Sequence, residues 1–368
     1  MRPTRQALGT LAAVLGLAAG YFLLARLGII FGESVVKISP FWPAAGFALM
    51  AAMLGRRRDL AGVALGAFAS AWMQNAWPGA LGIALGATAS AWLGAWLMRT
   101  IMQRAAWLGQ QQEALAYLVA ALFGPLIAVL VSGVTLIGLH RVPLDQAFGR
   151  LLTWWSGDAL GVLAAGPACL TVLAWVQHPP ALTRTHLAKS AGFLAGLAGI
   201  VAWLLLVDQS GGLIFLLLPL LVLIHILLGE QEVKIALLVV VAATVLGARL
   251  QHGATAVEPM LLEVFLSVFC VSALLISSLR RRELLTWPTF VLFGGWLLSG
   301  WLFLTLEKEE DALDELRFSQ TVATAERSLI DRMTTYIDVL RGGASLLSIT
   351  PTVTNQEWQR YISTPGAV

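Results

Sequence analysis

Apolar residues in this chain occur in long unbroken runs, separated by short polar segments. A helix needs about 20 mostly apolar residues to cross the hydrocarbon core of a bilayer. The runs that approach this length lie near residues 7–30, 43–54, 60–76, 80–101, 114–138, 151–176, 190–207, 212–229, 234–250, 259–279 and 286–306. This pattern predicts an all-α fold, a polytopic helical membrane bundle of about 10–11 spans. The second run is short and begins at Trp42-Pro43, where proline suits the first turn of a helix.

The composition excludes a soluble protein. Of the 368 residues, 58% are hydrophobic and 12% are charged, whereas a soluble domain carries about 25% charged residues. A soluble chain of this length would divide into domains that each need a polar surface. The apolar excess therefore faces lipid, and a soluble enzyme is excluded. A porin-like barrel is disfavoured because its strands would alternate apolar and polar residues.

The basic residues are distributed unequally between alternate connections. If the N-terminus is inside, the inner segments hold Arg2, Arg5, Arg56, Arg57, Arg58, Arg99, Arg104, Arg184, Lys189, Lys234, Arg280, Arg281 and Arg282. The outer segments hold Lys37, Arg141, Arg150 and Arg249. Because cytoplasmic loops carry the Lys/Arg excess, we expect a cytoplasmic N-terminus and an extracytoplasmic tail after residue 306. The arginine clusters are interpreted as topology anchors beside lipid headgroups, and no nucleic-acid partner is expected.

A repeat joins the third and fourth runs. Residues 62–72 read GVALGAFASAW, and residues 82–92 read GIALGATASAW. Small residues at every fourth position let helix backbones approach closely in lipid. The repeat therefore predicts close helix packing, with a tight pore or substrate path as the functional alternative.

After residue 306 the chain becomes polar and contains one long helical seam. The apolar positions of this seam follow spacings of three and four residues. They are Phe318, Val322, Ala325, Leu329, Met333, Tyr336 and Leu340. Such a seam either pairs with a second copy as a coiled coil or packs on a domain of its own chain. We expect Gly342-Gly343 to interrupt this helix, and Thr354 with Glu357 to form a capping box that begins a short one.

Candidate chemistry is sparse. The sequence has no zinc-protease, Cys-x-x-Cys, P-loop or nucleophile-elbow motif, so no catalytic residue, metal site or cofactor is predicted. Asp158 lies inside an apolar run, where a carboxylate must pair, take up a proton or face a polar cavity. It is therefore either a ligand or proton site or a hydrogen bond that fixes the bundle. Glu263, one turn beyond Pro259, is interpreted as interfacial, whereas His225 and Asp208 lie near the ends of runs, where solvation is the simpler interpretation.

Several motifs resemble a known family. Trp42-Pro43-Ala44-Ala45-Gly46, Gly55-Arg56-Arg57, and Gly157-Asp158-Ala159-Leu160-Gly161 followed by Pro167 are similar, in this order, to the first type of membrane-associated sensor (MASE) domain. The resemblance covers about residues 7–282. It makes Trp42, Pro43, Gly46, Gly157, Asp158, Gly161 and Pro167 candidate residues of functional or structural importance.

The tail resembles the beginning of a CHASE extracellular sensor domain. This similarity rests on Arg332-Met333, Tyr336 and Val339-Leu340-Arg341-Gly342, followed by Val353, Glu357-Trp358 and Tyr361. Together with the resemblance over 7–282, it implies a membrane sensor domain over 7–282, a further span over 283–306, and the beginning of an outer sensor domain over 307–368. The pocket, return span and output domain of such a protein are not in this sequence, which we interpret as a fragment or a truncated gene.

The two resemblances together imply the sensory input part of a bacterial inner-membrane receptor. Its output would be a histidine kinase or a cyclic-di-GMP enzyme such as a diguanylate cyclase, and no catalytic domain is expected in this chain. The expected partners are membrane lipids, a second copy of the chain and a small-molecule ligand. A secondary transporter or channel-like protein is the alternative, because an intramembrane carboxylate and glycine-rich helices also suit transport.

Overall fold

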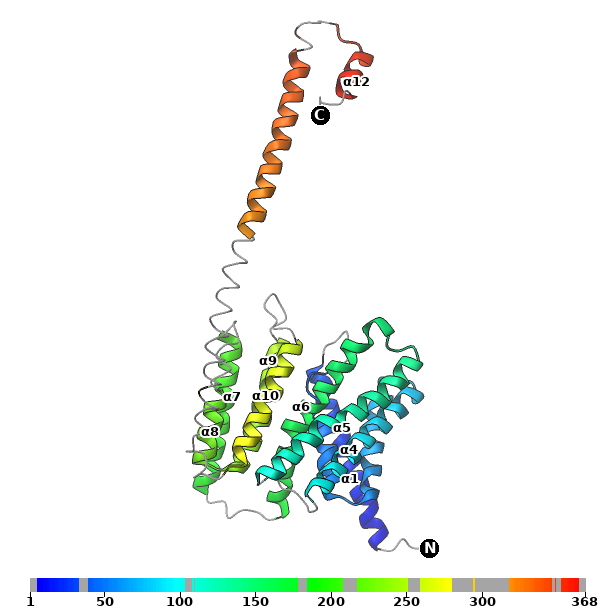
Figure 1. The fold of residues 1–368 in the computed structure, drawn as a ribbon, viewed down its shortest axis with the longest axis vertical. Coiled ribbons are helices and arrows are strands. Elements are labelled where there is room, and N and C mark those ends of the chain that lie inside the picture. Colours follow the sequence, from blue (N-terminus) through cyan, green and yellow to red (C-terminus); the bar gives the residue numbers. More distant parts are fainter. Residues whose placement is uncertain are drawn as a thin grey trace. The chain divides into compact units, whose positions relative to one another are not determined.

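The computed structural model describes residues 5–32, 39–102, 108, 110–177, 184–207, 217–250, 259–279, 294, 318–345, 348 and 352–363. These residues form helices and their connections, and no strand occurs among them. Contacts divide the chain into one unit over Met1–Gly300 and a second over Trp301–Val368. Figure 1 shows the helices of the first unit lying side by side as a bundle. The all-α prediction is confirmed.

The helices of the bundle coincide with the apolar runs. In the first part they are α1 (Arg5–Phe31), α2 (Pro43–Leu54), α3 (Leu60–Trp72), α4 (Trp77–Met102), α5 (Gln111–Gly138) and α6 (Leu144–Gln177), with a short 3-10 turn η1 (Arg57–Asp59) before α3. In the second part they are α7 (Arg184–Val207), α8 (Leu217–Leu227), α9 (Glu230–Leu250) and α10 (Pro259–Ser277). The predicted run over 286–306 lies outside the described residues, apart from Gly294. Pro43 occupies the first turn of α2, as its sequence position predicts.

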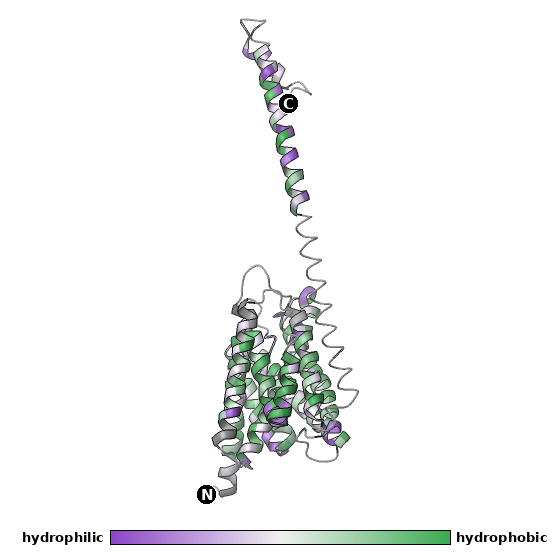
Figure 2. Ribbon diagram, turned by 90° about the vertical axis from the view of Figure 1, so that its left-hand side faces the viewer, coloured by the Kyte–Doolittle hydropathy of each residue, from purple (hydrophilic) through white to green (hydrophobic). Residues whose placement is uncertain are grey.

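Four described helices are long and apolar enough to cross a membrane by themselves: α1 from Gly9, α4, α5 and α6. The others include shorter apolar helices such as α2 and α8. Figure 2 shows that apolar residues predominate along the helices of the bundle. A multi-pass helical membrane protein is therefore confirmed, whereas the number of 10–11 crossings stays a prediction.

The glycine repeat packs two different pairs of helices. A side chain at Gly66 of α3 would overlap the Ala18 carbonyl oxygen of α1. In α4, a side chain at Gly82 or Gly86 would overlap Thr135 or Ser132 of α5. Each copy of the repeat thus allows a close helix contact, as the packing interpretation predicts.

Large side chains fill the second part of the bundle. Leu218 and Ile224 of α8, Leu237 of α9 and Phe269 of α10 are fully buried. His225 of α8 is also buried, and its Nε2 atom lies 3.2 Å from the Leu279 carbonyl oxygen. The expectation that His225 is solvated at the end of a run is therefore wrong, because α8 is covered by α9 and α10.

The second unit contains a long helix and a short one. Residues 318–345, here called the tail helix, are helical, and α12 (Asn355–Ser363) follows. Thr354 Oγ1 accepts from the Glu357 N–H at 3.4 Å, and the Thr354 N–H donates to Glu357 Oε2 at 2.9 Å. The predicted capping box is confirmed, and its hydrogen bonds from the backbone and hydroxyl of Thr354 hold the pKa of Glu357 below its ordinary value.

The expected interruption at Gly342-Gly343 is wrong, since the tail helix continues through both residues. A side chain at Gly342 would overlap the Tyr361 hydroxyl, and one at Gly343 would lie 2.9 Å from the Trp358 ring. The Tyr361 hydroxyl donates to the Val339 carbonyl oxygen at 3.0 Å. The two glycines therefore provide room for α12 to pack on the tail helix.

Candidate functional site

The site is organised by a close crossing of α2 and α6. Gly46 of α2 faces the backbone of Gly161 and Gly166, and a side chain on Gly46 would overlap the Gly161 carbonyl oxygen. A side chain on Gly161 would in turn overlap the Trp42 carbonyl oxygen. Neither helix can move away without losing this backbone contact. The glycines of the family-like motifs are therefore a structural device that fixes α2 against α6.

Two hydrogen bonds hold α6 in place at this crossing, one to the residue before α2 and one to α5. The Trp42 N–H donates to the Gly157 carbonyl oxygen at 3.1 Å, across the beginning of α2. The Tyr117 hydroxyl of α5 donates to the Val162 carbonyl oxygen of α6 at 2.7 Å. Pro167 is buried within α6 and has no N–H to donate in that helix.

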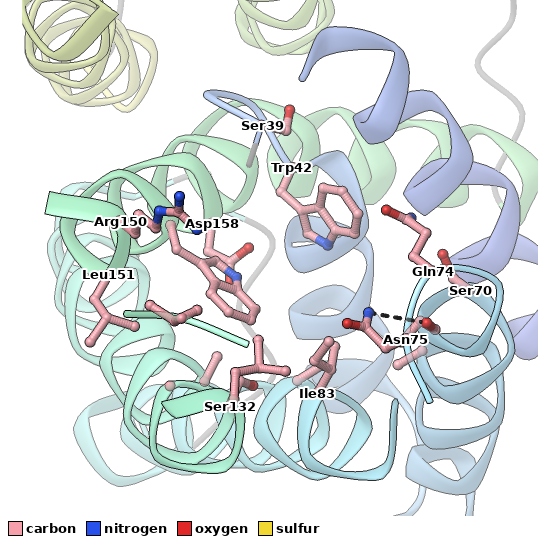
Figure 3. A pocket seen from close by; sticks show the side chains of 18 of the residues that line it. Ser39, Trp42, Ser70, Gln74, Asn75, Ile83, Ser132, Arg150, Leu151 and Asp158 are labelled. Carbon is pink, nitrogen blue, oxygen red and sulfur yellow. Dashed lines mark hydrogen bonds between the residues drawn. The ribbon is translucent and has the colours of Figure 1, made fainter. Parts of the chain in front are cut away.

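This crossing brings Trp42 beside Asp158. Both side chains line a cavity of about 310 Å³ among α1 to α6. Figure 3 shows Trp42, Asn75, Ser132 and Asp158 arranged around this space. A second, narrow cavity of about 20 Å³ also touches Trp42 and Asp158 and extends between α2, α4, α5 and α6. Asp158 therefore lines both cavities.

Asp158 is buried without a matching donor. The residue is 7% exposed, and its Oδ1 atom has no hydrogen-bond partner among the described residues. An unpaired carboxylate in a water-poor interior costs several kcal/mol unless a cation or proton neutralises it. Among the described residues no hydrogen bond from another helix reaches this Oδ1 atom, which itself has almost no accessible surface. The residue as a whole lines the cavity, and the choice between a ligand or proton site and a structural role in the bundle stays a prediction.

Polar and aromatic groups surround the carboxylate. Ser39 precedes α2, Ser70 belongs to α3, and Ser132 belongs to α5. Gln74 and Asn75 come from the connection between α3 and α4, where the Asn75 amide donates to the Ala71 carbonyl oxygen at 3.2 Å (Figure 3). Tyr21 of α1 lines the same cavity as Trp42. The cavity can therefore offer hydrogen bonds and ring faces to a small polar molecule.

Two arginines lie along the cavity wall. Arg141 is exposed in the connection between α5 and α6, and Arg150 is half-buried near the beginning of α6. The Arg150 Nη2 atom donates to Gln146 Oε1 at 2.7 Å. Among the described lining residues, Asp158 is the sole acidic side chain. The cavity thus has a basic mouth and an acidic interior.

Glu263 connects the helix of the site with α10. It is 1% exposed, and the Ser156 hydroxyl of α6 donates to its Oε2 atom. Its Oε1 atom has no partner among the described residues. Glu263 is therefore buried where α10 packs on α6, and its expected place at the membrane interface stays a prediction. Ser156 lies two residues from Asp158, so α6 contacts both the cavity and α10 within one turn.

Sequence reasoning found part of this site. Trp42 and Asp158 line the cavity, while Pro43, Gly46, Gly157 and Gly161 belong to the crossing. Pro167 is buried in α6, and its predicted importance stays a prediction. The predictions missed Tyr21, Trp154, Arg150 and the amides of the α3–α4 connection. A signal was present for two of them, since Arg150, Trp154 and Asp158 follow each other at intervals of four residues on α6.

The predicted seam belongs to the other unit and takes no part in this cavity. Its residues Phe318, Val322, Ala325, Leu329, Met333, Tyr336 and Leu340 are exposed on the tail helix. Ile330 and Ile337 are exposed as well and widen the apolar face.

Comparison with known proteins gives a family for the bundle. The MASE1 family model matches residues 10–284, which is most of the chain and includes all the helices of the bundle beyond the first turns of α1. No curated protein and no solved structure matches the chain. MASE1 domains are membrane-associated sensory domains of signalling proteins and have no catalytic activity of their own. The chain therefore belongs to the MASE1 family.

Proposed function

We propose that this chain is the sensory input part of a bacterial signal-transduction receptor, and that occupancy of the cavity around Asp158 is the event it senses. The observation that carries the proposal is the buried, unpartnered carboxylate of Asp158 in a cavity of about 310 Å³. Structural carboxylates in spans normally have a partner. A buried carboxylate that lines an open cavity is suited to bind something that comes and goes.

The signal would leave the cavity through α6. Ser156 and Asp158 belong to neighbouring positions of this helix, and Ser156 donates to Glu263 of α10. A ligand that shifts α6 would therefore change the position of α10, from which the chain continues toward its tail. A ligand can shift such an equilibrium only by its difference in affinity for the two states.

The output domain and the placement in the membrane are also proposals. The output would be a histidine kinase or a diguanylate cyclase encoded beyond this sequence, after completion of the CHASE-like domain that begins in the tail. The excess of basic residues in alternate connections favours a cytoplasmic N-terminus in the inner membrane. The cavity mouth at Arg141 would then open to the periplasm.

Reporters fused after Arg58, Arg104 and Arg282 should be cytoplasmic, and one after Glu315 should be periplasmic. A cytoplasmic reporter at Glu315 would contradict this topology.

The sensory role is tested by substituting Asp158 in the complete receptor encoded by the gene. Asp158→Asn keeps the shape of the side chain and removes its charge, so output in cells should become locked and differ from wild type by roughly tenfold, the effect of about 1.4 kcal/mol on a two-state equilibrium. The control is Asp145→Asn, an exposed acidic residue in the first turn of the same helix. Equal output in both variants and wild type, at equal protein levels, would contradict the proposal.

The transport alternative predicts a different outcome. If the cavity were a transport path, the purified chain in liposomes would exchange a bound small molecule across the membrane, and Asp158→Asn would abolish that exchange. A sensor binds its ligand without moving it. Net uptake that depends on Asp158 would therefore replace the sensory proposal by transport.

The tail helix is proposed to pair with the same helix of a second chain. Its exposed apolar face motivates this homodimer. In membranes, single cysteines at Leu329 or Met333 should crosslink two chains, whereas cysteines at Arg327 or Asp331 should not. The experiment is repeated in the complete receptor, because crosslinking in this chain alone would indicate an exposed stripe that another domain normally covers.

A further inference from the structure

The cavity has opposite charges at its two ends. Arg150, Trp154 and Asp158 are four residues apart on α6 and all line the cavity. With a rise of about 1.5 Å per residue, the Cα atoms of Arg150 and Asp158 are about 12 Å apart along the helix. Arg141, from the preceding connection, lines the same cavity as Arg150. A molecule in the cavity therefore meets a carboxylate at one end and guanidinium groups at the other.

The inner end is suited to a positive group. The Oδ1 atom of Asp158 has no hydrogen-bond partner among the described residues, and a positively charged donor in the cavity beside this carboxylate would offset the cost of burying its charge. The rings of Tyr21, Trp42 and Trp154 also line this cavity. Aromatic faces attract ammonium groups, most strongly where water is excluded. Carboxylate and rings together favour an organic ammonium group.

The outer end disfavours a ligand with one kind of charge. A simple amine would have to pass two arginines that repel it, and a simple acid would have to approach the Asp158 carboxylate. A molecule that carries both charges avoids both penalties when its amine enters first. The volume of about 310 Å³ is at the lower end of the range for ligand pockets and equals about ten water molecules. It suits a small metabolite rather than a peptide.

We propose that the cavity binds a small zwitterion of the amino-acid type, with its ammonium group on Asp158 and its acidic group toward Arg141 and Arg150. The inference rests on the proposed function, because it names the chemical class that the sensory cavity recognises. Gln74, Asn75 and Ser132 supply neutral hydrogen-bonding groups between the two charged ends.

Binding is tested with the full chain in lipid nanodiscs and with three matched probes: 4-aminobutyrate, n-butylamine and butyrate. Glycine and 6-aminohexanoate, each with its amine and acid analogue, extend the series to shorter and longer molecules. At least one zwitterion should raise the unfolding temperature of wild type more than its amine or acid analogue at equal concentration, because ligands that bind the folded state stabilise it. Calorimetric titration of that zwitterion then gives its affinity.

Three variants locate the binding. Asp158→Asn should weaken the affinity for the zwitterion by roughly 10–100-fold, the usual effect of losing a charged hydrogen bond. Arg150→Gln should weaken it toward the affinity of the matching amine. Asp145→Asn should leave it unchanged, since Asp145 is exposed and does not line the cavity. Asp158→Asn is expected to fold, because it replaces an unpaired charge by an amide of equal size. The comparison of probes is made in wild type and does not depend on the folding of this variant.

The other outcomes separate failure of the ligand class from failure of the proposed function. Equal stabilisation by amine and zwitterion would refute the role of the arginines. No stabilisation by any of the zwitterions at about 10 mM would refute binding of this class. Unchanged affinity in Asp158→Asn would place binding elsewhere. Zwitterion binding in a receptor whose output ignores Asp158 would leave the ligand class intact and remove the sensory function. Output that depends on Asp158 without zwitterion binding would leave the sensory function intact and remove the ligand class.

Discussion

The two parts of the bundle use glycine in different ways. In α2 and α6, Gly46, Gly157 and Gly161 face backbone atoms of a neighbouring segment, and no side chain larger than hydrogen fits there. In α7, Gly192, Gly196 and Gly199 have no neighbouring atom within 4 Å of where a side chain would begin. The helices α8 to α10 are instead held by large residues such as Leu218 and Phe269.

This difference shows how close packing and an open cavity occur in the same set of helices. Backbones that touch at Gly161 fix the positions of Trp42 and Asp158 without filling the space above them. Interdigitated leucines leave little space between the helices of the second part. This part is therefore better suited to passing a shift of one helix to its neighbour than to binding a ligand. Glycine content alone does not identify a binding site. What identifies it is glycine in backbone contact beside a polar residue.

The largest expected effect separates the two kinds of glycine. Gly161→Ala should destabilise the bundle by about 3 kcal/mol, because its methyl group overlaps the Trp42 carbonyl oxygen and forces α2 away from α6. Gly196→Ala should be neutral or stabilise by up to about 1 kcal/mol, because the side chain meets nothing and the unfolded chain loses freedom. Unfolding in detergent would measure both. Equal effects would remove the distinction between the two parts.

A second comparison uses leucines. Leu218 of α8 is fully buried among large side chains, so Leu218→Ala should cost about 2 kcal/mol or more by leaving a new void. Leu136 of α5 lines the existing cavity, and its truncation enlarges a space that is already open. Leu136→Ala should therefore cost at least about 1 kcal/mol less. A larger loss at Leu136 would mean that the cavity wall is as tightly packed as α8.

The link between the two parts is expected to contribute less. Ser156→Ala removes the donor to Glu263 and leaves a buried carboxylate with fewer partners, at a cost of about 1–2 kcal/mol. Thr153→Ala, one turn earlier on α6, removes an exposed hydroxyl that bonds within the helix, and should be nearly neutral. If the two variants are equally stable, α6 and α10 are coupled by packing rather than by this hydrogen bond.

Local patterns predicted the helices well because a span is defined by its own residues. The ten described helices of the bundle each coincide with an apolar run, and the capping box at Thr354 forms as its spacing indicates. The partners of polar groups depend on distant parts of the chain. Glu263 meets Ser156 over 107 positions, and His225 meets Leu279 over 54. Position within a run could not reveal either contact, so His225 was expected to be solvated and Glu263 to lie at the membrane interface.

The tail offers the smallest expected effect and a third use of glycine. Gly342 and Gly343 lie within a continuous helix and provide room for rings of α12 rather than for another backbone. Tyr361→Phe removes the hydroxyl that donates to the Val339 carbonyl oxygen, and should weaken the docking of α12 by about 1 kcal/mol. Hydrogen exchange of the α12 amides should then be roughly fivefold faster, because exchange reports this local opening. Tyr336→Phe is the matched control, since Tyr336 lies exposed on the same tail helix. Faster exchange in both variants would indicate a general loosening of the helix, and no change in either would mean that the fit of the rings against Gly342 and Gly343 holds α12 without the hydrogen bond.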